Sequence, residues 1–225
     1  MNALNLTVLI IVLLIFVYIL YYFFFSTITY VNSTMLNLNA AVTPYSKLAL
    51  PTSARYAYGA WIYVNNLGVK NMIISRPSTS GNNISLYLDP TSPTLYCDLQ
   101  MNDNSVQTTP ITNNFPIQRW CFIIVSVDGQ FVDYYLNGKL IKSEKKTLMM
   151  ATPPDVNTPL YLGNNPFIPF DAYLGRVIQW TNPIDPQTAW TTYLNGNGLS
   201  SNISPYHANL SFIKDNVTSS TYQLW

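Results

Sequence analysis

Hydrophobic and polar positions divide the chain into three parts that have different patterns. Residues 6–25 form an unbroken apolar run, residues 53–180 alternate over short runs separated by Pro, Gly and Asn clusters, and Asn and Ser dominate after residue 195. Alternation with a period of two indicates strands with one buried face, and the middle part shows no helical period of useful length. The pattern therefore predicts an all-β domain between an apolar segment and a polar extension.

Turn signals in the middle part recur roughly every 8 to 12 residues, which favours a sandwich or a barrel. A first strand is expected at Met35–Val42. The remaining strands are expected at Tyr56–Val64, Asn71–Arg76, Ile84–Asp89, Leu95–Met101, Trp120–Asp128, Phe131–Leu136, Lys139–Lys142, Leu160–Gly163 and Ala172–Gln179. We divide the chain into an anchor (1–25), a connector (26–50), a β-sandwich (51–195, its first strand starting from about 35) and a C-terminal extension (196–225).

Phase within the expected strands supports two packed sheets. In 131–136, Val132, Tyr134 and Leu136 share one face, so that this face belongs to the core and the other is half-wet. Residues 120–127 are apolar on both faces, which predicts a central strand covered on both sides. The two-residue connections 129–130 and 137–138 close hairpins, the second with the Asn-Gly pair that type I′ turns prefer.

The apolar run from Leu6 to Phe25 contains twenty residues and no charge. As a helix it would be about 30 Å long, the thickness of the hydrocarbon core of a bilayer. A cleavable signal peptide would instead have a basic start and a small-residue cleavage site, whereas this chain starts MNALN and the run ends in three Phe. We therefore expect a single-pass anchor in a lipid bilayer. Its orientation stays open, because the nearest basic residues, Lys47 and Arg55, lie too far from it.

Charged residues make up only 9% of the chain, against about 25% in an ordinary soluble domain. A surface of amides and hydroxyls is cheap to desolvate, which suits packing against other subunits or against glycans. The densest charge cluster, Lys139–Lys146, indicates a solvated hairpin. Nucleic-acid binding requires several convergent cations, and one short patch does not predict it.

Two groups of residues leave the cellular compartment open. Cys97 and Cys121 lie in expected strands, where they either pair or remain buried thiols. Asn-x-Ser/Thr sequons would accept glycans if the domain faced a lumen or the outside. They occur at Asn5, Asn32, Asn83, Asn202, Asn209 and Asn216.

Three segments together resemble LamG-like (concanavalin A-like) jelly-roll domains. The first is WCFIIVSVDGQFVDYYLNGKL, in which Trp120 opens a strand and Tyr135, Asn137, Gly138 and Lys139 close the hairpin. The second is YAYGAWIYV with Trp61, and the third runs from PLYLGN, with Gly163 and Asn164, to FDAYLGRVIQW, with Gly175 and Val177, followed by a short helix at 185–193. The resemblance implies an all-β concanavalin A-like jelly-roll sandwich, here preceded by one transmembrane helix. Its motif residues are structural: Gly138 supplies a positive φ, and both tryptophans fill the core.

The family includes glucanases and calcium-binding modules, so the resemblance raises glycoside hydrolysis and calcium binding as two possible chemistries for this chain. Retaining glycosidases need two carboxylates about 5 Å apart, but the chain has one glutamate, Glu144, and scattered aspartates. Its one histidine, His207, lies in the extension, which leaves neither a catalytic triad nor a zinc site. The sequence therefore predicts no enzyme and no cofactor. The weak candidates for calcium at the sandwich rim are Asp89, Asp103, Asp155 and Asp171.

Two functional hypotheses remain. In the first, which the sequence favours, the protein is structural: an anchored, charge-poor LamG-like domain resembles minor capsid proteins of large eukaryotic DNA viruses. This implies shell proteins as partners and a location between the virion's inner membrane and its capsid. In the second, the domain is a surface lectin or adhesion module that binds glycans. The extension, which ends in Leu224 and Trp225, packs on its own domain or adds a strand to a neighbour.

Overall fold

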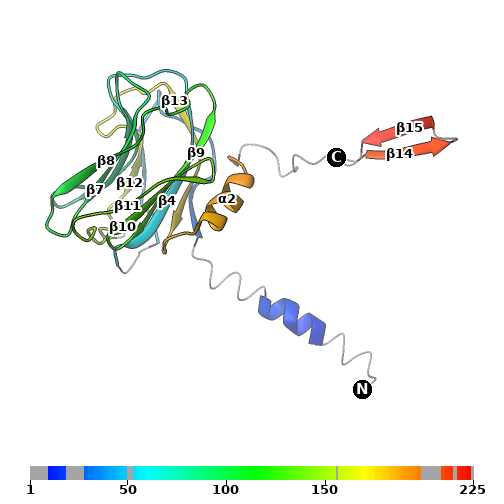
Figure 1. Ribbon diagram of the computed structural model, residues 1–225, viewed down its shortest axis with the longest axis horizontal. Coiled ribbons are helices and arrows are strands. Elements are labelled where there is room, and N and C mark those ends of the chain that lie inside the picture. Colours follow the sequence, from blue (N-terminus) through cyan, green and yellow to red (C-terminus); the bar gives the residue numbers. More distant parts are fainter. Residues whose placement is uncertain are drawn as a thin grey trace.

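The structure, a computed structural model, describes residues 10–18, 28–49, 53–155, 157–198, 209–214 and 217–223 (Figure 1). Two antiparallel sheets face one another and form the sandwich. The seven-stranded sheet has the order β1-β13-β4-β9-β10-β11, with β2 paired to β13, and the six-stranded sheet has the order β3-β12-β5-β6-β7-β8. The all-β prediction is confirmed.

The strand bounds follow the alternation seen in the sequence. The seven-stranded sheet contains β1 (Ile28–Asn32), β2 (Leu36–Asn37), β4 (Arg55–Val64), β9 (Trp120–Asp128), β10 (Phe131–Leu136), β11 (Lys139–Lys145) and β13 (Ala172–Trp180). The six-stranded sheet contains β3 (Thr43–Tyr45), β5 (Asn71–Ser78), β6 (Gly81–Leu88), β7 (Leu95–Gln100), β8 (Val106–Thr112) and β12 (Leu160–Leu162).

The core lies between the sheets and is built from alternate residues of each strand. On β10, Val132 and Tyr134 are fully buried in it, as the predicted phase requires. β9 is buried along both faces, so the prediction of a doubly covered central strand is also confirmed. Asn137 and Gly138 have φ values of 51° and 75°, the two positive values of a type I′ turn.

Helix α2 (Pro186–Leu194) covers part of the outer face of the seven-stranded sheet (Figure 1). It begins where Asp185 Oδ1 accepts a hydrogen bond of 2.7 Å from the Thr188 amide and a proline occupies the first turn. Beneath the helix, Trp61 stacks on Phe122 and on Tyr193, with ring centroids 5.1 and 5.4 Å apart. The helix and the outer face thus share a second hydrophobic cluster.

Two regions differ from the prediction. The segment taken as a connector, 26–50, supplies β1, β2 and β3, so the sandwich starts at Ile28. β8 was not predicted, because its sequence VQTTPIT includes Pro110 and is mostly polar. Proline is tolerated here because β8 is an edge strand, where one side of the backbone needs no partner.

The N-terminal and C-terminal parts are described incompletely. Residues 10–18 are helical, and their large side chains are between 49% and 68% exposed. Within the described ranges we find no helix with the length and hydrophobicity needed to cross a bilayer. The rest of the predicted anchor lies outside those ranges. In the extension, β14 (Asn209–Lys214) and β15 (Val217–Gln223) pair as a two-stranded sheet.

Candidate functional site

The outer face of the six-stranded sheet contains a pocket of about 300 Å³. It lies over β5 and β6 and reaches β7. Its wall includes aromatic, aliphatic, hydroxyl and charged side chains. The lining residues include Lys70, Met72, Ser85, Tyr87, Pro90 and Asp98. The volume is at the lower end of the range for small-molecule sites.

Strand alternation explains why these residues face outward. On β6, Leu86 and Leu88 are buried in the core, so the residue between them, Tyr87, projects from the other face. On β7, Cys97 and Leu99 are buried in the same way, which places Tyr96 and Asp98 on the outer face. The pocket is therefore a product of the same pattern that builds the core.

Tyr87 and Tyr96 form a cross-strand aromatic pair. The two residues are partners in the β6–β7 register, and their rings stack with centroids 5.6 Å apart and planes 22° apart. The register continues the row to Met72 on β5 and to Pro110 on β8. Cross-strand aromatic pairs stabilise both partners, so Tyr96 restricts the ring of Tyr87.

Asp98 fixes the other end of the Tyr87 side chain. Its Oδ1 accepts hydrogen bonds from the Tyr87 hydroxyl at 3.2 Å and from Thr108 Oγ1 at 2.6 Å. Burial and the neighbouring Asp98 raise the pKa of Tyr87 to about 12, so at neutral pH the phenol stays protonated and donates. Tyr87 is thus held by a ring on one side and a carboxylate at its tip.

The arrangement is suited to binding. A fixed aromatic ring with Met72 and Pro90 offers an apolar wall, while Asp98, Ser85 and Lys70 offer an acceptor, a hydroxyl and a cation. Among the described lining residues Asp98 is the one carboxylate, whereas glycoside hydrolysis uses a pair. A ligand with apolar C–H faces and several hydroxyls matches both kinds of wall.

Comparison with known proteins identifies the family. The profile of the concanavalin A-like lectin/glucanases superfamily matches residues 37–189, more than half of the chain. The chain belongs to this superfamily. None of the curated proteins matches the sequence significantly.

Solved structures show the same concanavalin A-like fold. The binding domain of botulinum neurotoxin serotype G has a TM-score of 0.53 and 16% identity over 71% of this chain and 41% of that chain. The serotype D ligand-binding domain in complex with N-acetylneuraminic acid has a TM-score of 0.56 and 11% identity over 74% of this chain and 45% of that chain. Trypanosoma rangeli sialidase in complex with sialic acid has a TM-score of 0.50 and 13% identity over 63% of this chain and 23% of that chain. This chain thus spans less than half the length of each of these three structures.

The motif residues that resemble the concanavalin A-like family have structural positions. Gly138 has a positive φ, and a Cβ there would lie 2.9 Å from the Trp190 ring. Trp61 is buried between the sheet and α2 instead of between the two sheets. Trp120 is half-buried on the outer face, packed edge-on against Tyr63 at 5.7 Å, so its expected place in the core is wrong.

Four further motif residues shape loops or hairpins. Asn137 Oδ1 accepts a hydrogen bond from the Phe122 amide at 2.9 Å, which joins the hairpin to β9. Gly163 has a φ of 97°, and a Cβ on Gly175 would lie 3.1 Å from the Asn197 carbonyl oxygen. Tyr135 is fully buried, and its hydroxyl donates to the Ile184 carbonyl at 3.4 Å. None of these four residues lines the pocket.

The four calcium candidates lie in loops, where they bind groups of their own neighbourhood. Asp89, Asp103 and Asp155 each accept from an amide two residues later, at 2.8 to 2.9 Å. Asp171 accepts from Asn65 and Asn66 side-chain amides at 2.9 and 2.7 Å. The described ranges contain no group of three or more His, Cys, Asp or Glu residues that could hold a metal ion.

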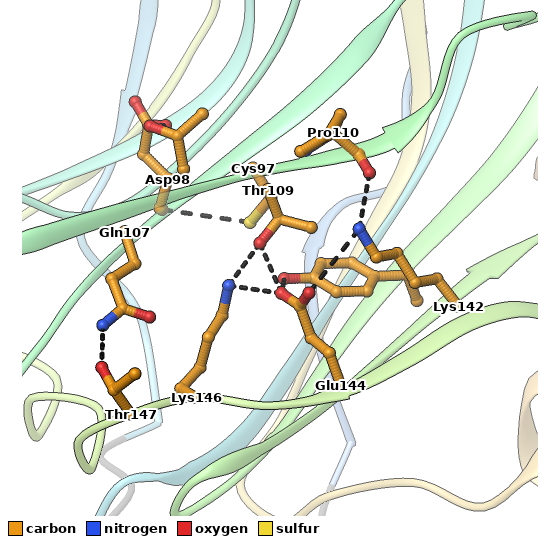
Figure 2. Close-up of polar contacts among 11 residues, drawn as sticks. Cys97, Asp98, Gln107, Thr109, Pro110, Lys142, Glu144, Lys146 and Thr147 are labelled. Carbon is orange, nitrogen blue, oxygen red and sulfur yellow. Dashed lines mark hydrogen bonds and ion pairs between the residues drawn. The ribbon is translucent and has the colours of Figure 1, made fainter.

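A second polar cluster joins the edges of the two sheets, where β8 faces β11. Figure 2 shows the Glu144 carboxylate between the ammonium groups of Lys146 and Lys142 and the Thr109 hydroxyl. The Lys146 side chain is only 6% exposed, so the prediction of a solvated basic hairpin is wrong at this residue. Burial acts to raise the pKa of Glu144, but Lys146 and Thr109 outweigh it and lower that pKa. We assign the cluster to closure of the sandwich.

The structure describes the side chains of both cysteines and of two sequon asparagines, Asn83 and Asn32. Cys97 and Cys121 are both buried free thiols, and burial raises the pKa of each. Asn83 is 1% exposed, and its Nδ2 donates to the Ala151 carbonyl at 3.4 Å, so the folded domain cannot carry a glycan there. Asn32 Nδ2 donates to the Gly175 carbonyl at 3.1 Å. The side chains of Asn202, Asn209 and Asn216 lie outside the described part.

The sequence analysis did not identify Tyr87, Tyr96 and Asp98 as residues of a candidate site. The alternation around each of them marked it as outward-facing, so an aromatic residue on two successive expected strands was a usable signal. The sequence did not supply the register, which places the two tyrosines opposite one another and Asp98 beside Tyr87.

Proposed function

We propose that this protein is a non-catalytic carbohydrate-binding module whose ligand occupies the Tyr87 pocket. The observation that carries the proposal is the Tyr87 ring, which is stacked on Tyr96, held at its hydroxyl by Asp98, and faces a pocket with mixed apolar and polar walls. A ring that is already fixed loses little conformational entropy when a sugar packs on it, which favours binding.

Two kinds of comparison support this function. The family profile is that of lectins and glucanases, and the similar structures include a domain with bound N-acetylneuraminic acid and a sialidase with bound sialic acid. Most of the similar chains are binding domains of larger proteins. The identities are low, so these structures support a sugar as the ligand class without indicating which sugar.

The proposed module is tethered to a membrane. Residues 10–18 present large apolar side chains, from Ile10 at 49% to Tyr18 at 68% exposed, to their surroundings. Exposing nine such side chains to water would be unfavourable, because the burial of each methylene group contributes about 0.8 kcal/mol of stabilising free energy. They belong to the apolar run 6–25, which has the length of a spanning helix. The capsid-tethering role stays a prediction, since none of the similar structures named above is a capsid or virion protein.

Binding of a glycan panel to the full chain in lipid nanodiscs tests the proposal. We expect one class of sugar to bind, and Tyr87→Ala to weaken its binding by roughly 30-fold, the effect of an interaction worth about 2 kcal/mol. Tyr30→Ala is the matched control, because Tyr30 is 51% exposed on the other sheet. Binding that survives Tyr87→Ala, or a folded chain that binds no glycan of the panel, would refute the proposal.

A further inference from the structure

Cross-strand register identifies the end of the sandwich at which the chain enters from residues 1–27. Ile28, the first residue of β1, pairs with Trp180, and Trp180 pairs with Ala57 near the start of β4. The start of β4 pairs with the last residues of β9, so the β9–β10 turn at Gly129 belongs to the same end. We call this the entry end.

Loops of the six-stranded sheet meet the β9–β10 turn at the entry end. The Met150 amide donates to the Gly129 carbonyl at 3.1 Å, and Met150 forms a bridge with Met101 at the end of β7. The Asn102 amide donates to the Met149 carbonyl at 2.9 Å. Residues 101–106, 129–131 and 147–150 therefore form one loop cluster.

This loop cluster is unusually apolar for an exposed surface. Phe131 is 55% exposed, Val106 and Met149 are each 49% exposed, and Leu148 is 36% exposed. Ile28, where the chain enters, is 39% exposed. Single exposed apolar residues are ordinary, but several on adjoining loops indicate contact with a partner or a membrane.

The charges around the cluster balance. Lys145 lies over the Phe131 ring, 5.7 Å from its centroid, and Arg55 pairs with Asp128 at 3.3 Å. With Asp103 in the β7–β8 turn, these residues amount to two cations and two carboxylates. A long cation beside an aromatic ring is typical of the membrane interface, where the ammonium reaches the headgroups. A neutral cluster favours a lipid surface that needs no net charge.

We propose that the entry end rests on the lipid bilayer that holds residues 6–25. This inference builds on the tether proposed above. Only Ser26 and Thr27 separate the apolar run from β1. Because a residue spans at most about 3.6 Å, the entry end lies within roughly 11 Å of the end of the run. The short connection brings the apolar loops to the interface, where they bury their exposed surface.

Docking in this way presents the Tyr87 end of the pocket away from the membrane. Gln100 Nε2 donates to Ser80 Oγ at 2.6 Å, which places the β5–β6 turn at the entry end. Tyr87 lies six residues along β6 from Gly81, next to its far end. At about 3.3 Å per residue the ring is roughly 20 Å further from the bilayer than that turn. The membrane contact and the proposed sugar site therefore do not compete.

Depth-dependent fluorescence quenching tests the docking. The full chain is reconstituted in phosphatidylcholine vesicles with an environment-sensitive label on Met149→Cys, and in parallel on Leu148→Cys. Val69→Cys is the control, since Val69 is 81% exposed beside the pocket. The unsubstituted chain, in which Cys97 and Cys121 are buried, gives the background. Membrane flotation is measured on the same samples.

We expect the labels at 148 and 149 to shift to shorter emission wavelengths and to be quenched by doxyl-labelled lipid, and the label at 69 to do neither. High salt leaves these results unchanged, because the cluster is neutral. If the chain floats with the vesicles but labels 148 and 149 stay unquenched, the docking is wrong and the tether stands. If the chain does not float, both are wrong, and sugar binding by the Tyr87 pocket is unaffected.

Discussion

The outer faces of the two sheets carry the same kinds of residues but have different neighbours. On the seven-stranded sheet, Trp61 and Phe122 lie under α2 and are at most 6% exposed. On the six-stranded sheet, Tyr87 and Tyr96 stack in register and remain half-buried beside a pocket. Strand alternation placed both groups on outer faces. Helix α2 covers the first group and makes it part of the scaffold, whereas the second group lines or supports an open pocket.

An outward aromatic residue is therefore a candidate for binding only where no other element covers it. The two tryptophans belong to the motifs that resemble the LamG-like family, yet Trp61 is buried under α2 and Trp120 packs on Tyr63. Tyr87 and Tyr96 belong to no motif. Substitutions on the covered face should therefore change mainly the free energy of unfolding, and substitutions on the open face mainly the affinity for a glycan.

Trp61→Ala should lower the free energy of unfolding by about 3–5 kcal/mol, because it removes a buried ring from between the sheet and α2. Denaturant unfolding measures this loss. Trp190→Ala is the control: Trp190 lies on the same helix but is 43% exposed, so its loss should be well below half as large. The folded fraction of the Trp61 variant should keep its glycan affinity. A weaker affinity in that fraction would contradict the separation of the two faces.

Gly138→Ala should lower the free energy of unfolding by about 2–3 kcal/mol. The new Cβ would sit at a φ of 75° and lie 2.9 Å from the Trp190 ring. Gly129→Ala separates the two causes, since its φ is 65° but its nearest neighbour, Met149, is 3.8 Å away. Only the backbone cost, about 1 kcal/mol, remains there. Equal losses for both variants would show that α2 exerts no steric constraint on the turn.

Glu144→Gln should cost about 2 kcal/mol, between the values of an exposed and a buried pair, because it leaves the Lys146 ammonium buried without its carboxylate. The pKa of Glu144 is lowered below its ordinary 4.5 in the folded state. Its contribution is therefore complete above about pH 5 and is lost as the pH falls through the folded pKa.

Stability measured from pH 7 to pH 3 should thus decline less steeply in Glu144→Gln than in the natural chain. Asp128→Asn is the control, since Asp128 and Arg55 are 50% and 57% exposed and their pair contributes at most about 1 kcal/mol. If the two variants lose stability equally, the cluster does not join the sheets as inferred.

Tyr87→Phe should have the smallest effect on stability, about 1 kcal/mol, because only the hydrogen bond to Asp98 is lost. The ring remains for a sugar to pack on, so affinity should fall by less than in Tyr87→Ala. Tyr161→Phe, on β12 of the same sheet and outside the pocket, is the control and should leave affinity unchanged. Titration calorimetry compares the three variants. If Tyr87→Phe lost as much affinity as Tyr87→Ala, the hydroxyl of Tyr87 and not its ring would make the main contact with the sugar.

The fold class and most strands follow from the amino-acid pattern alone, because burial of one strand face requires apolar residues with a period of two. β9 was predicted correctly for this reason, and the Asn137-Gly138 turn was predicted correctly because type I′ turns prefer an Asn-Gly pair. The local pattern of hydrophobic and polar residues did not predict strands that form mainly because they pair with a neighbouring strand. β8, a mostly polar edge strand with Pro110, and β1 to β3, short strands in a polar segment, form because neighbouring strands offer partners.

The composition of the site was present in the sequence, but its assembly was not. Alternation alone marked Tyr87, Tyr96 and Asp98 as outward-facing. Only the register of β6 with β7 placed the tyrosines opposite one another, and only the position of α2 decided which outer face stayed open. Register and helix docking depend on contacts between residues far apart in the chain, and a local pattern of hydrophobic and polar positions does not encode them.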